Sequence, residues 1–260
     1  MLVGIAYRRE LFEWIISCPE AVGCVEITAE HFFDTTGNIL DDLRVNYPVF
    51  VHGLGLSLGT PGRLDQTYLN KFSEICHRVD AKWVSEHIAF TRTQDIDLGH
   101  LNPVPYNEQM LKVMHEHIDE LSDQCQRPVI LENITSHLSV PGTMPETEFI
   151  NRLCETSGCG LLLDITNLFV NSRNHQFDPV DWLNQISPEY IIQTHVVGYS
   201  CISGQYEDYH SESIQPVLWK LIDQVLDYAK VQATILERDS NFPPVEELGF
   251  ELGRLSSRVN

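Results

Sequence analysis

Basic residues are scarce in this chain of 260 residues. It holds 17 Lys and Arg against 37 Asp and Glu, which gives a formal net charge of -20 at pH 7. No run of Lys or Arg is present to form a local basic patch. Because such a surface repels nucleic-acid phosphates, we expect no nucleic-acid partner. Bound cations would account for part of the acidic excess, since metal ions neutralise clustered carboxylates.

The cysteines form no recognisable metal-binding or redox motif. Their number is odd, and no CxxC pair occurs among them. The first residues, MLVGIAYRRELFEW, lack the basic start and the apolar stretch of a signal peptide. No apolar segment approaches the roughly 20 residues that a membrane helix requires. We therefore expect a cytoplasmic protein with reduced thiols and no membrane association.

A glycine-rich phosphate loop is also absent, which disfavours an open nucleotide-binding sheet. What is present is an alternation of short apolar runs, typical of parallel strands, with amphipathic helical stretches. The predicted strands are Leu2–Tyr7, Gly23–Thr28, Val49–Gly53, Trp83–Ile88, Val129–Asn133, Gly160–Asn167, Tyr190–Gly198 and Ala233–Asp239. The predicted helices are Arg9–Cys18, Asn38–Tyr47, Gln66–Val79, Asn107–Gln126, Pro145–Ser157, Asp178–Ile186, Ile214–Lys230 and Val245–Ser257.

These strand–helix units follow one another without a linker or a low-complexity segment. They predict an α/β protein, a single (βα)8 TIM barrel, with one domain over residues 1–260. A hydrophobic content of 43% is ample for one large core. In this fold the C-terminal ends of all strands meet at one rim, where active sites lie.

Polar residues end nearly every predicted strand. Burying an imidazole or a carboxylate is costly unless the group is paired or binds a metal ion. Because side chains alternate along a strand, Ile130 and Glu132 share a face that can point at the barrel axis. We interpret Glu26, Glu30 and Glu86 as supporting residues. The strand-end residues that we interpret as metal ligands are His52, His87, Glu132, Asp164, His195 and Glu237.

A further pair of candidate ligands follows the seventh predicted strand, in a loop. Asp208 and His210 are two residues apart, so in an extended segment both can reach one ion. His and carboxylate ligands without Cys suit Fe, Mn or Zn. The complete set over-supplies a single ion, whereas two or three ions bridged by carboxylates would use it all.

The stretches around these residues resemble a known family. They include VHGLGLSLG at His52, VSEHIAF at His87, VILENI at Glu132, THVVGY at His195 and TILERD at Glu237. Over nearly its whole length the chain is similar to the multinuclear non-heme iron-dependent oxidative enzymes, which include the oxidase of methanobactin biosynthesis. The resemblance implies two or three irons of mixed Fe(II)/Fe(III) valence, held by the candidate ligands, and O2 as co-substrate. It also implies a Cys-containing ribosomal precursor peptide as substrate and a separate leader-peptide-recognition partner protein.

Other polar residues near the rim are candidates for the reaction itself. Asp239, at the end of the last strand, is the candidate proton acceptor. The candidates for substrate contact are Asn133 and Asn167, at strand ends, and Asn174 and His175, in the loop after the sixth strand.

Two other classes of function stay open. A metal-dependent hydrolase or isomerase of the endonuclease IV or xylose isomerase type also places His and carboxylates on a barrel rim. The charge of -20 disfavours a nuclease, and Lys82 lies at the wrong end of its strand for an isomerase's rim lysine. A non-catalytic metal-binding scaffold is the second alternative, which O2 consumption with candidate peptides would rule out.

Overall fold

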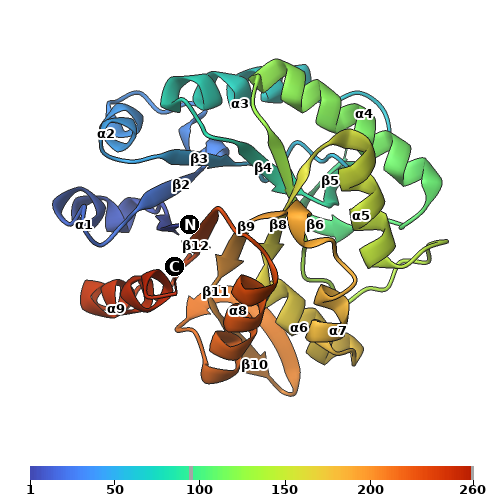
Figure 1. The fold of residues 1–260 in the computed structure, drawn as a ribbon. Coiled ribbons are helices and arrows are strands. Elements are labelled where there is room, and N and C mark those ends of the chain that lie inside the picture. The colour runs from blue at the N-terminus through green and yellow to red at the C-terminus, as the bar shows by residue number, and fades with distance from the viewer. Residues whose placement is uncertain (94–95, 259–260) are drawn as a thin grey trace.

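Eight parallel strands close into a barrel in the computed structural model, which describes residues 1–93 and 96–258 (Figure 1). Around the barrel the strands follow the order β1-β12-β9-β8-β7-β4-β3-β2. β1 pairs with β12 in parallel, which closes the ring and confirms the predicted fold. The barrel strands are β1 (Leu2–Ala6), β2 (Cys24–Thr28), β3 (Val49–His52), β4 (Val84–His87), β7 (Val129–Glu132), β8 (Gly160–Asp164), β9 (Ile191–Val196) and β12 (Ala233–Leu236).

Helices surround the strands on the outside (Figure 1). Asn107 is the N-cap of α4, because its side-chain Oδ1 accepts a hydrogen bond from the backbone N–H of Met110. The predicted helix Asp178–Ile186 is shorter in the structure. No helix in the described part of the chain is long and apolar enough to cross a membrane. The helices are α1 (Phe12–Ser17), α2 (Ile39–Asn46), α3 (Gln66–Val79), α4 (Glu108–Cys125), α5 (Glu146–Ser157), α6 (Ile165–His175), α7 (Pro179–Leu183), α8 (Pro216–Tyr228) and α9 (Val245–Ser256).

The barrel interior is filled by alternate residues of the strands. Phe50 and Trp83 stack with ring centroids 4.2 Å apart near the N-terminal end. Ile130 belongs to the same interior cluster, whereas its neighbour Leu131 packs in the larger core toward the helices. This alternation confirms the predicted parity, and it sends Glu132 along the barrel axis toward the C-terminal mouth.

The predicted strand Gly160–Asn167 is too long, because β8 ends at Asp164. The side chain of Asp164 accepts the backbone N–H of Asn167, and this cap starts α6 directly after the strand. The helix α6 is absent from the prediction. Asn174 and His175 therefore lie in the last turn of a helix and not in a loop.

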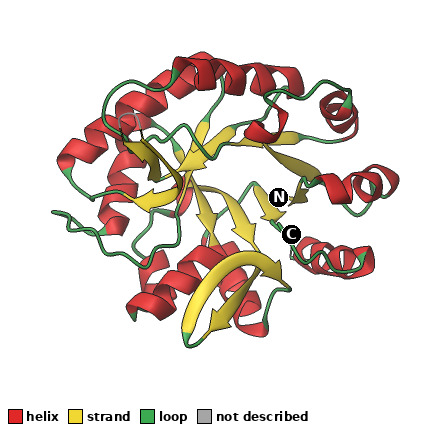
Figure 2. Ribbon diagram, turned by 180° about the vertical axis from the view of Figure 1, so that it is seen from behind, coloured by secondary structure: helices red, strands yellow, loops and turns green. Residues whose placement is uncertain are grey.

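Two β-hairpins at the mouth were not predicted. They are formed by β5 (Ala89–Thr93) with β6 (Ile96–Pro103) and by β10 (Gly198–Ile202) with β11 (Gln205–Glu212). The β10–β11 hairpin packs on α6 (Figure 2). The rings of Phe169 in α6 and Tyr199 in β10 have centroids 4.8 Å apart. Asp208 and His210 lie in β11, so the segment is a strand and not the predicted loop.

Candidate metal centre

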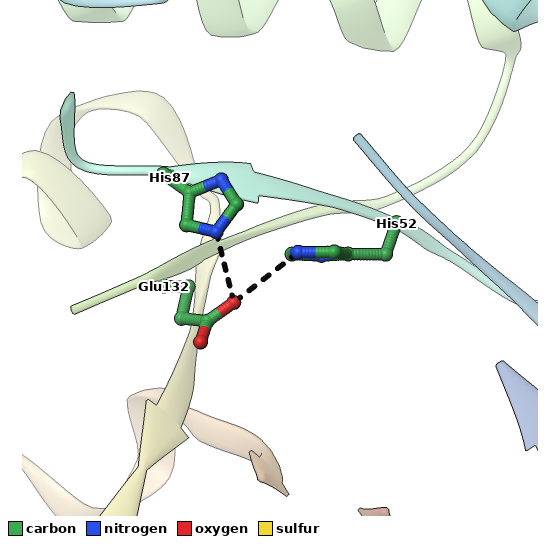
Figure 3. A group of neighbouring side chains, drawn as sticks. All are labelled: His52, His87 and Glu132. Carbon is green, nitrogen blue, oxygen red and sulfur yellow. Dashed lines mark ion pairs between the residues drawn. The ribbon is translucent and has the colours of Figure 1, made fainter. Parts of the chain in front are cut away.

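Two histidines and a carboxylate form the first group at the barrel mouth (Figure 3). His52 ends β3, His87 ends β4 and Glu132 ends β7. Oε2 of Glu132 lies 3.4 Å from Nε2 of His52 and 3.4 Å from Nε2 of His87. All three side chains are buried, and their facing atoms lie within 4.8 Å of one another. This spacing fits a single bound ion.

The second group shares Glu132 with the first. It adds Asp164 at the end of β8, His195 in β9 and Glu237 just after β12, all of them buried. Nδ1 of His195 lies 2.9 Å from Oε2 of Glu237 and 3.4 Å from Oε1 of Glu132. Glu132 thus directs one oxygen at the first group and the other at the second, as a bridging carboxylate would.

The third group joins the barrel to the β10–β11 hairpin. It contains Asp164 together with Asp208 and His210 of β11. Nε2 of His210 lies 2.6 Å from Oδ2 of Asp208, and His210 has φ of 50°, a left-handed conformation that non-glycine residues rarely adopt. Such conformations cluster at functional sites. The three groups form one continuous cluster, because Glu132 and Asp164 each belong to two of them.

Three of the four histidines have their outer ring nitrogen engaged, so the other nitrogen faces the cluster. An outer contact of this kind fixes the ring orientation of a metal-binding histidine. Two of the partners are Glu26 and Glu86, in the supporting role that we predict for them. The outer contacts are His52 Nδ1 to Ser85 Oγ at 2.8 Å, His87 Nδ1 to Glu86 Oε2 at 3.4 Å and His195 Nε2 to Glu26 Oε1 at 2.6 Å.

Several buried polar atoms of the cluster lack a hydrogen-bond partner within the described residues. Buried polar atoms are otherwise nearly always paired in folded proteins. The unpaired atoms of this cluster fit coordination of metal ions, because a bound ion would satisfy carboxylate oxygens and imidazole nitrogens together. The atoms are Glu132 Oε2, Asp164 Oδ2, His195 Nδ1, Asp208 Oδ1 and His210 Nδ1.

The charges of the cluster are unbalanced. Burial and the neighbouring carboxylate of Asp208 raise the pKa of Asp164 well above its ordinary value. Burial alone would also raise the pKa of Glu237, but nearby imidazoles, above all His195, and the guanidinium of Arg8 hold it well below its ordinary value. The imidazoles of His195 and His210 also lower the pKa of Asp164, but they do not offset its burial, and a divalent ion would supply the missing positive charge.

Comparison with known proteins identifies the family. The model of the RiPP precursor modification enzymes MbnB/TglH/ChrH, which act on ribosomally made, post-translationally modified peptides, matches residues 2–260. The chain belongs to this family. A UPF0276 protein of Rhizorhabdus wittichii is 33% identical over 256 residues, covering 96% of this chain and 92% of the relative. A UPF0276 protein of Caulobacter vibrioides is 32% identical over 235 residues, covering 89% and 84%.

Solved structures share the fold of this family member. A D-psicose 3-epimerase has a TM-score of 0.64 at 12% identity, covering 99% of this chain and 97% of its own. Endonuclease IV from Thermus thermophilus has a TM-score of 0.61 at 13% identity, covering 100% and 99%. The IOLI protein, described with a zinc atom, has a TM-score of 0.65 at 14% identity, covering 99% and 96%. These likenesses concern the barrel alone.

The residues predicted to contact substrate occupy different places. Asn133 and Asn167 brace the cluster: Nδ2 of Asn133 donates to the carbonyl of Asp164 at 3.0 Å, and Nδ2 of Asn167 donates to the carbonyl of Asn133 at 3.0 Å. Asn174 holds the hairpin by exchanging two hydrogen bonds with the backbone of Tyr206. His175, the last candidate, lines a neighbouring cavity, and its Nε2 lies 2.6 Å from the carbonyl oxygen of Ser136. Of these four residues, Asn167 alone lines the cavity over the cluster.

A cavity of about 590 Å³ opens over the cluster, and Arg8 lines it. Arg8 follows β1, the one barrel strand whose end carries no His or carboxylate. The pattern of polar strand ends does not reveal this residue. Its guanidinium lies 3.3 Å from Oε1 of Glu237 and pairs with Asp239. Closure of the barrel is the signal that could have found it, because β1 and β12 are then neighbours.

Proposed function

We propose that the protein is a multinuclear non-heme iron enzyme that uses O2 to oxidise a cysteine residue of a ribosomally made precursor peptide. The observation that carries the proposal is the continuous cluster of three His and carboxylate groups joined through Glu132 and Asp164. Membership of a family of precursor-peptide modification enzymes gives the class of substrate. Bound iron would supply O2 reduction and would lower the pKa of a coordinated cysteine thiol.

The residues of the cluster would together coordinate two or three ions. The ligands would be His52, His87, Glu132, Asp164, His195, Asp208, His210 and Glu237, in the three groups described above. Ser85, Glu86 and Glu26 would fix the rings of three histidines by their outer nitrogens.

The cavity over the cluster would receive the reacting cysteine. Leu54, Leu101 and Ile134 supply apolar walls that exclude water around the thiol. Asp239 is 43% exposed at the edge of this cavity, where it can pass a proton to water, and it stays the candidate proton acceptor. A separate partner protein would hold the leader peptide, as the family resemblance implies.

Anaerobic purification followed by elemental analysis and Mössbauer spectroscopy tests the proposal. We expect two or more irons per chain and uptake of O2 when a Cys-containing precursor peptide is added, with a mass change in the peptide. The same peptide with Cys replaced by Ser is the control and should stay unchanged. Stoichiometric zinc or manganese that resists replacement by ferrous ion would contradict the assignment of iron.

The fold likeness to an epimerase and an endonuclease supports a second candidate, a metal-dependent hydrolase or isomerase. The two candidates differ in their need for O2. Among the described residues that line the cavity, Arg8 is the sole Lys or Arg, and it is already paired with carboxylates. This leaves little basic surface for a nucleic-acid backbone. Turnover of a sugar or a nucleic acid without O2 would favour the second candidate.

A further inference from the structure

Arg8 is a fixed cation at the edge of the metal cluster. Its side chain is 12% exposed, and Nη1 donates to the carbonyl of Tyr7 at 2.8 Å, which anchors the guanidinium to the end of β1. Nε donates to Oδ1 of Asp239 at 2.7 Å, and Nη2 lies 3.3 Å from Oε1 of Glu237. The guanidinium therefore bridges two carboxylates that follow the same strand.

Each of these carboxylates divides its oxygens between Arg8 and an imidazole. Oε2 of Glu237 lies 2.9 Å from Nδ1 of His195, and Oδ2 of Asp239 lies 3.2 Å from Nδ1 of His210. Glu237, Asp239 and His210 also form a fourth group whose atoms lie close enough together to hold an ion. Among the ion pairs of the described residues, Arg8 is the only Lys or Arg that reaches any of the four groups, and it contacts two of the three members of the fourth.

We propose that Arg8 is a positioning residue that takes the place of a metal ion in the fourth group and keeps Asp239 out of the ligand set. The inference rests on the metal centre of the proposed function. A guanidinium stays charged at any working pH and offers planar donors that match two carboxylates. Its charge opposes the entry of a divalent ion at the same point. Oε1 of Glu237 is thereby occupied, and Oε2 is left for the second group.

Counting the ions that bind to variants of the full chain tests this assignment. The metal-free protein is titrated with Mn²⁺, and free Mn²⁺ is followed by electron paramagnetic resonance. We expect Arg8→Met to bind one more ion per chain than the wild type, because Glu237 and Asp239 lose their internal cation. Adding Asp239→Asn to Arg8→Met should return the count to the wild-type value. Asp239→Asn alone should leave the count unchanged, since Asp239 is not a ligand while Arg8 is present.

Arg152→Met is the matched control. Arg152 pairs with Glu108 on the helical surface, so its loss removes the same charge away from the cluster and should leave the count unchanged. An unchanged count in Arg8→Met, or an additional ion that survives Asp239→Asn, would overturn the proposal. Loss of an ion in Asp239→Asn alone would also overturn the proposal. This single variant keeps the proposal testable even if Arg8→Met does not fold. A wild type that binds no ion contradicts the proposed metal centre instead, because the role of Arg8 is read from differences between variants.

Discussion

Glu132 offers a sharp test of the cluster, because it belongs to two groups while Asp208 belongs to one. Oε2 of Glu132 faces His52 and His87 at 3.4 Å each, and Oε1 faces His195 at 3.4 Å. The substitution Glu132→Gln keeps the shape of the side chain and removes the charge that both oxygens share. If two ions flank this carboxylate, both should lose affinity together.

The size of the effect follows from the loss of one charged contact at each ion. A residue that only orients a metal ligand contributes about 10- to 100-fold in metal affinity, so loss of a directly coordinating carboxylate should weaken binding at least about 10-fold per ion. Zn²⁺ titration of the metal-free protein by calorimetry, with a competing chelator, resolves the separate affinities. We expect Glu132→Gln to weaken two ions, whereas the matched variant Asp208→Asn should weaken one.

The reasoning is refuted by either of two results. Glu132→Gln that weakens a single ion would mean that the carboxylate does not bridge. Asp208→Asn that weakens two or more ions would mean that the groups are not separable as the distances indicate. Circular dichroism of both variants checks that the barrel is intact before affinities are compared.

Further predictions concern pH, ring orientation and the barrel core. Burial raises the pKa of Glu30 from 4.5 to about 7, so the folded protein keeps a proton that the unfolded chain releases. Stability should therefore fall as pH rises between these values, by at most about 3 kcal/mol, and Glu30→Gln should flatten this dependence in urea unfolding. Ser85→Ala removes the outer partner of His52 and should weaken the ion at that histidine about 10- to 100-fold in Zn²⁺ titration. Trp83→Phe removes the N–H that donates to Oε1 of Gln193, and it should lower the free energy of unfolding by about 1–3 kcal/mol. An unchanged free energy of unfolding would mean that a water molecule replaces the indole N–H as donor.

Strand parity explains why the barrel and the strand-end cluster could be predicted from the sequence. The interior position of Ile130 fixes the direction of Glu132, whatever the helices outside do. The overrun at Asp164 has a local cause. The apolar run LLLDITNLF continues through the capping residue, so hydrophobicity alone does not mark where strand becomes helix. The stronger signal for the start of α6 is Asp164 as its N-cap, which accepts a hydrogen bond from the backbone N–H of Asn167.

The missed β10–β11 hairpin had a sequence signal of its own. Ser203 and Gly204 have φ of 53° and 87°, which is the pair of positive values that a tight hairpin turn requires. A Ser-Gly pair between two polar strands is a recognised turn signal. Hydrophobic periodicity does not detect the hairpin, because the flanking strands are half-exposed and carry no apolar alternation. The hairpin matters because it delivers Asp208 and His210 to the cluster.

Arg8 could not be predicted in the same way, because its partners are more than two hundred residues away in the sequence. Arg8 and Asp239 are 231 residues apart and meet where the first and last strands close the ring. No local pattern around Arg8 distinguishes it from Arg9, whose side chain makes no contact with the cluster that the structure records. Finding it requires the topology first, then the question of which residue the remaining strand contributes.

A buried polar chain ties the floor of the barrel to the metal cluster. Nε1 of Trp83 donates to Oε1 of Gln193 at 2.7 Å, and Nε2 of Gln193 donates to Oε2 of Glu26 at 2.5 Å. The other oxygen of Glu26 lies 2.6 Å from Nε2 of His195, whose Nδ1 faces the second group. Residues at the start of β4, in β9 and in β2, three strands that are not adjacent in the ring, thus set which nitrogen of one histidine is free. The side chains that pack the floor of the barrel therefore also orient a candidate metal ligand.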